Sequence, residues 1–77
     1  MNKPRRATLA DIQSMIEEAK SLLEDVLSEE EEYKDNMPEN LQSSEKYERA
    51  EQACDDMSEA ISNLEDAISY IESAIEQ

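Results

Sequence analysis

Apolar residues recur at alternating intervals of three and four along two long stretches, the spacing of helices with one buried face. In the second stretch the series runs unbroken through Tyr47, Ala50, Cys54, Met57, Ile61, Leu64, Ile68, Ile71 and Ile75. Alanines follow one flank of this series at seven-residue intervals, at Ala53, Ala60, Ala67 and Ala74. Because small side chains let another helix approach closely, this flank predicts contact with more than one neighbouring helix.

The first stretch predicts a helix over residues 8–34, preceded by a flexible basic arm over residues 1–7. Its series, which we expect to face the second helix, comprises Ile12, Ile16, Ala19, Leu23, Val26, Glu30 and Tyr33. Three further residues widen its apolar side, namely Met15, Leu22 and Leu27. Thr8 with Asp11 resembles a capping arrangement at the helix start, whereas Pro4 opposes an earlier start.

The stretch YKDNMPENLQSSEKY interrupts the two series at residues 33–47. Pro38 disfavours helical geometry at the residue before it, and Ser43 or Ser44 is a good N-cap for a new helix. The pattern therefore predicts a loop over residues 35–43, a second helix over residues 44–77, and one all-α domain over residues 8–77.

The predicted fold is an antiparallel two-helix hairpin of the coiled-coil type. We expect Met37 and Leu41 to lie beneath the loop, and Tyr33 and Tyr47 to face each other and close that end of the core. The second helix is expected to be the longer one, so its last turns, from about Tyr70, have no mate in the chain. Since two helices enclose little core, we predict a homodimer that forms a four-helix bundle, or a stable complex with another protein's helices.

The composition lacks several residue types that catalytic and metal sites commonly use. The 77 residues include no histidine, no glycine and one cysteine, so common catalytic sites, phosphate-binding loops and zinc sites cannot be assembled. We predict a protein that is not an enzyme and has no catalytic, cofactor-binding or metal-binding residues. Cys54 lies in the apolar series and is expected to be buried. No stretch is long and apolar enough to span a membrane or resembles a secretory signal, and a cytoplasmic location is expected.

The net charge indicates more about possible partners than any sequence motif does. There are 21 acidic and 7 basic residues, a net charge of −14, and three of the basic residues are Lys3, Arg5 and Arg6. Such a surface repels nucleic acid and anionic membranes and favours a protein partner with a basic surface. On a helical rod roughly 40–50 Å long the acids lie about 2–2.5 Å apart, close to the charge density of duplex DNA.

This density predicts a protein that mimics nucleic acid. Two groups are expected to carry the surface. The first surrounds the loop and comprises Glu29, Glu30, Glu31, Glu32, Asp35 and Glu39. The second extends along the second helix and comprises Glu48, Asp55, Asp56, Glu59 and Asp66. Tyr70 falls outside the apolar series and is a further candidate for contact with a partner.

The stretch DNMPENLQSSEKYERAEQA and the Ala-Ile-Ser heptads after it resemble the short acidic helical proteins of phages and prophages of Gram-positive bacteria. Size and charge are also similar to those of anti-CRISPR and other anti-defence inhibitors, several of which mimic DNA. The resemblance implies an inhibitor of a nucleic-acid-binding host protein. Two alternatives remain: a structural or adaptor module whose product is the four-helix bundle itself, and an immunity-type or antitoxin inhibitor.

Overall fold

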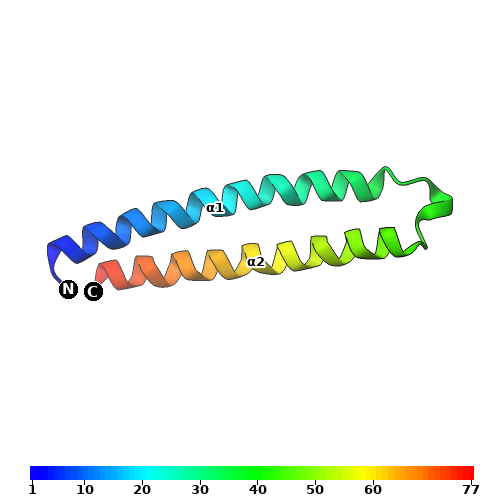
Figure 1. Cartoon of the computed structure of the whole chain (residues 1–77). Helices are drawn as coiled ribbons and strands as arrows, with labels where there is room; N and C mark the ends of the chain where they lie inside the picture. Colours follow the sequence, from blue (N-terminus) through cyan, green and yellow to red (C-terminus); the bar gives the residue numbers. More distant parts are fainter.

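The structure, a computed structural model, describes all 77 residues as two long helices joined by a short connection (Figure 1). Helix α1 spans Lys3–Asp35, the short 3-10 helix η1 spans Glu39–Leu41, and helix α2 spans Glu45–Glu76. The two long helices lie side by side along a rod of 59 × 14 × 12 Å (Figure 1). The predicted all-α antiparallel hairpin is therefore confirmed, as a single chain. No helix is apolar over a length sufficient to cross a membrane.

Helix α1 begins earlier than the sequence suggested. The side chain of Asn2 accepts a hydrogen bond from the backbone N–H of Arg5 at 2.9 Å and caps the helix. Pro4 lies in the first turn, where a missing N–H costs nothing. The Thr8 hydroxyl donates to the carbonyl of Pro4 at 3.1 Å, inside the helix. The predicted arm over residues 1–7 and the predicted cap at Thr8 are thus corrected: residues 3–7 are helical.

The connection ends α1 and starts α2 at the expected places. Helix α1 ends at Asp35, and the backbone N–H of Asn36 donates to the carbonyl of Glu32 at 3.0 Å. Of the two candidate serines, Ser44 caps α2, and its hydroxyl accepts from the backbone N–H of Tyr47 at 3.3 Å. The short 3-10 helix η1 between them was not predicted.

The apolar series of α2 lies on the side facing α1, as predicted. Ala50, Cys54 and Ile61 are buried, and the other members are half-buried. Ala50, Cys54 and Ile61, with Met37 from the connection, are the only buried residues of the chain. The hairpin alone therefore encloses a thin core, and no side chain in it is completely removed from solvent.

The face that α1 turns toward α2 differs from the predicted one. Its half-buried residues are Arg6, Leu9, Gln13, Ile16, Lys20, Leu23, Leu27, Glu30 and Lys34. Only Ile16, Leu23 and Glu30 of the predicted series are among them. The other four, Ile12, Ala19, Val26 and Tyr33, are exposed. The helix is rotated so that one edge of its broad apolar arc meets α2 while the other edge faces outward.

Two expectations about the rod's ends are also corrected. With 33 residues in α1 and 32 in α2, the helices match in length, and both termini lie at the same end (Figure 1). No overhang of α2 from Tyr70 onward exists.

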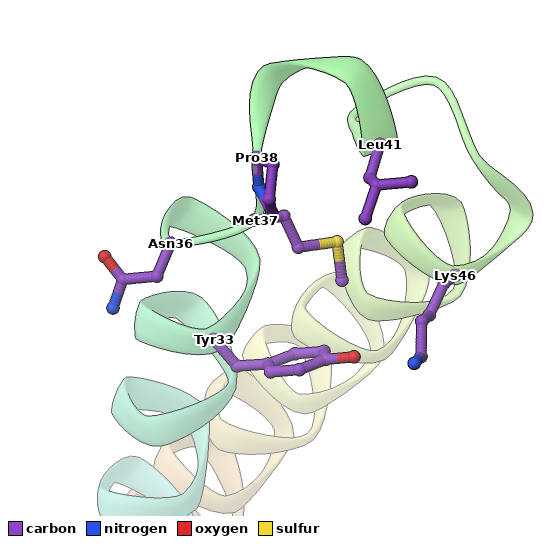
Figure 2. Close-up of a pocket in the computed structure, with 6 residues that line it drawn as sticks. All are labelled: Tyr33, Asn36, Met37, Pro38, Leu41 and Lys46. Atoms are coloured by element: carbon purple, nitrogen blue, oxygen red, sulfur yellow. The ribbon is translucent and has the colours of Figure 1, made fainter.

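At the loop end Met37 is buried as predicted, but Leu41 is 44% exposed and Tyr33 is 45% exposed. Tyr33 lies beneath the Met37 thioether at that end (Figure 2), and Met37 is the residue of the two that is buried.

The cap of α2 gives a matched test of this connection. We expect Ser44→Ala to lower the free energy of unfolding by about 1 kcal/mol, because the backbone N–H of Tyr47 loses its partner. Ser43→Ala removes an exposed hydroxyl that caps nothing and should leave stability within about 0.5 kcal/mol of wild type. Urea unfolding followed by circular dichroism at one protein concentration makes the comparison. Equal losses in the two variants would refute the cap.

Candidate functional site

The acidic residues of the predicted partner surface lie on the outside of the rod. All of them are exposed except Glu30, which is half-buried in the face that α1 turns toward α2. Tyr70 is the most exposed of the large apolar residues, at 77%. The rod therefore presents the carboxylates to solvent along both helices.

Few of these charges are compensated. Lys20 pairs with Glu65 across the two helices at 3.5 Å, and Arg49 pairs with Glu45 one turn away at 2.6 Å. No other acidic side chain makes an ion pair. Because the remaining carboxylates act together at long range, the field around the rod is strongly negative.

The acids are denser at the loop end than elsewhere. Glu30, Glu31 and Asp55 all lie close enough to Cys54 to raise the pKa of its thiol. The end of α1 and the first half of α2 thus bring acids from both predicted groups to one level of the rod. Asp35 closes α1 beside them, and Glu39 begins η1. We call residues 29–32, Asp35, Glu39, Glu48, Asp55 and Asp56 the loop-end acidic surface.

The other predicted residues lie elsewhere. The Lys20–Glu65 pair shows that α2 around residue 65 lies beside α1 around residue 20, near the middle of the rod. Asp66 is therefore far from the loop, and Tyr70 lies closer still to the end of α2 at Glu76. The structure does not unite Asp66 and Tyr70 with the loop-end acidic surface, and Glu59 lies between the two regions.

A shallow pocket of about 360 Å³ opens at the loop end. It is lined by Tyr33, Asn36, Met37, Pro38, Leu41 and Lys46. Figure 2 shows the Met37 thioether above the Tyr33 ring, with the Lys46 side chain on the far side of the opening and the Asn36 amide directed away from it. The lining is mainly apolar with one cation, so the pocket suits an apolar side chain of a partner better than any catalytic chemistry.

An exposed apolar stripe on α1 is the feature that the sequence interpretation missed. It comprises Ile12, Met15, Ala19, Leu22, Val26 and Tyr33, on alternating intervals of three and four apart from a gap at Glu29. Met15 is 66% exposed and Leu22 is 60% exposed. The signal was present in the sequence, because Met15 and Leu22 broaden the arc beyond what one neighbouring helix can cover.

No group of three or more Cys, Asp or Glu side chains has an arrangement that could hold a metal ion. No known protein family matches the chain, and neither a curated protein nor a solved structure matches it. The candidate site is therefore defined by surface charge, the loop-end pocket and the outward stripe of α1.

The environment of Cys54 predicts an unreactive thiol. Burial raises the pKa of Cys54 above its ordinary value of 9.0, Lys34 lowers it, and Glu31, Glu30 and Asp55 raise it. We expect iodoacetamide at pH 8 to modify native Cys54 at least about tenfold more slowly than an exposed thiol, because access and thiolate formation are both reduced. The matched control is Ser58→Cys in a Cys54→Ala background, at an exposed position one turn further along α2. Equal rates in the native proteins would contradict the burial.

The same pKa shift predicts a pH dependence of stability. Because the folded-state pKa is raised, the unfolded chain loses its thiol proton first, so the contribution of Cys54 is complete below pH 9.0 and declines above it. Wild type should therefore lose stability relative to Cys54→Ala as the pH rises from 8 toward 10.5. A constant difference between the two unfolding free energies would exclude this linkage.

Proposed function

We propose that this protein is a small acidic inhibitor that binds a basic, nucleic-acid-binding protein and occupies the groove meant for DNA or RNA. The observation that carries the proposal is the density of carboxylates along a narrow rod, nearly all of them without an ion-pair partner. Over a length of 59 Å the 21 acids lie on average about 3 Å apart, wider than the predicted spacing of about 2–2.5 Å and than the about 1.7 Å per charge of duplex DNA. At the loop end the spacing is closer.

The distribution of charge along α1 also supports a binding role. Its first turn contains no acid but holds basic Lys3, Arg5 and Arg6, while its last turns contain residues 29–32 and Asp35 with Lys34 as the one base among them. Both ends oppose the helix dipole, which favours acids at the start and bases at the end. These charges therefore do not stabilise the helix. Binding of a basic partner would explain why the acidic residues lie at its end.

The proposal places the protein among inhibitors of the kind that phages use against host defence. It includes a cytoplasmic site of action, no direct contact with nucleic acid, and a homodimer, which would double the acidic surface. An immunity-type or antitoxin inhibitor would use the same surface against one cognate basic protein.

A second candidate function has its own support. The exposed apolar stripe of α1 favours an adaptor or structural module whose interactions run through apolar contacts. Salt distinguishes the two functions, because counterion-dependent binding weakens steeply as salt rises while apolar binding does not.

The charge-reversal test uses the immobilised protein, lysate from a Gram-positive bacterium, and mass spectrometry of what is retained. We expect nucleic-acid-binding proteins to be captured at 50 mM salt, to fall at least about tenfold at 200 mM, and to be displaced by duplex DNA. The variant Glu31→Lys, Asp35→Lys, Asp55→Lys should lose this capture. Its matched control, Glu17→Lys, Glu18→Lys, Glu72→Lys, makes the same change in net charge away from the loop end and should retain most of it.

Helicity measured by circular dichroism must be the same in both variants and wild type. Capture that survives 200 mM salt and excess duplex would refute the mimic and favour the adaptor. Equal losses in the two triple variants would refute a surface localised at the loop end.

A further inference from the structure

We propose that a second copy of this chain covers the outward stripe of α1 and the alanine flank of α2, with the two hairpins antiparallel and their loops at opposite ends. We call these residues together the open face. This inference takes its homodimer from the proposed function and adds the surface and the orientation.

The two parts of the open face lie on the same side of the hairpin. The Lys20–Glu65 ion pair marks one edge of the groove between the helices. The outward stripe lies on the opposite edge of α1 from Lys20. The alanine flank, at Ala53, Ala60, Ala67 and Ala74, lies on the opposite edge of α2 from Glu65. One side of the hairpin is thus bordered by charge, and the other is apolar across both helices.

The core is open on this side. Ile12, Ala19 and Val26 of α1 are exposed on this side, and Leu64 and Ile71 of α2 are half-buried beside the half-buried alanines. A second layer of helices over the open face would continue the existing α1–α2 interface rather than create a separate one. This continuity is typical of a four-helix bundle, in which each helix contacts two neighbours.

The dimensions fit a second copy. The stripe over residues 12–33 and the alanine flank over residues 53–74 each extend about 32 Å along their helix. Given the register of the ion pair, they occupy the same segment of the rod. The rod measures 59 × 14 × 12 Å, so the open face takes up more than half of its length and lies centred away from both ends.

Charge decides the orientation. The loop end carries the loop-end acidic surface, whereas the other end carries Lys3, Arg5 and Arg6, none of which makes an ion pair. Antiparallel hairpins bring the basic start of each α1 to the level of the other copy's acidic loop end. Hairpins with both loops at one end would instead place two acidic surfaces together.

Sedimentation equilibrium at 50 µM protein and 150 mM salt tests the contact. Wild type should have twice the chain mass of 8.8 kDa. Leu22→Glu puts a charge at the middle of the stripe and should weaken association at least about a hundredfold, giving monomers. Ser21→Glu adds the same charge on the opposite side of α1 and should remain dimeric. A monomeric wild type, or a dimeric Leu22→Glu, would overturn the proposal.

Orientation is measured by pulsed electron paramagnetic resonance with one spin label at Asn40→Cys in a Cys54→Ala background. Asn40 is exposed in η1, at the tip of the hairpin. Antiparallel hairpins centred on the stripe place the two labels about 50 Å apart. A distance of about 20 Å would mean that both loops lie at one end and would overturn the orientation. This readout needs no destabilising change in the open face, so it remains decisive if Leu22→Glu unfolds.

The variants also separate this inference from the proposed function. The triple lysine variant of the loop-end acidic surface should lose capture of nucleic-acid-binding proteins and stay dimeric. If wild type is monomeric yet still captures them in a salt-dependent way, the dimer is wrong and the inhibitor stands. A wild-type dimer that captures nothing leaves the dimer in place and refutes the inhibitor.

Discussion

The antiparallel contact between α1 and α2 is the constraint on which the rest of the structure depends. Each long helix has an apolar side, and most helical stability in proteins comes from burying such a side against another element. Here the contact is made by Ala50, Cys54 and Ile61 against a mixed face of α1 that includes Lys20 and Glu30. The stems of long side chains can cover apolar surface while their charged ends reach water or a partner, as Lys20 does with Glu65.

That contact uses only half of the apolar surface of α1, and it leaves the acids on the outside. The outward stripe results from the rotation of α1 against α2, and the same arrangement leaves the acidic side chains exposed. The apolar side suits association with helices, and the acidic side suits a basic surface. The two sides are separate along most of the rod and meet at the loop end, where Glu29 lies in the gap of the outward stripe.

Much of the fold could be predicted from the sequence, and the failures have physical causes. The series of α2 was unambiguous because Glu51 and Glu65 border one side of it and alanines the other. The apolar arc of α1 is wide, and two series through Ile16 and Leu23 fit equally well, so the spacing could not tell which edge of the arc faces α2.

Pro4 was interpreted as a barrier to the helix although it is compatible with a first turn, and Asn2 was overlooked as the cap of α1. The loop-end acids could be grouped from the sequence because they flank one connection, whereas the position of Asp66 and Tyr70 depends on the register.

The direct test of the hairpin is the distance between its two ends in solution. Dyes attached at Asn2→Cys and Gln77→Cys in a Cys54→Ala background, diluted with an excess of unlabelled protein, report energy transfer within one chain. The hairpin should give nearly complete transfer, since adjacent helices lie about 10 Å apart and both termini are at one end (Figure 1). Transfer near zero, as a continuous helix of about 115 Å through Pro38 would give, would contradict it.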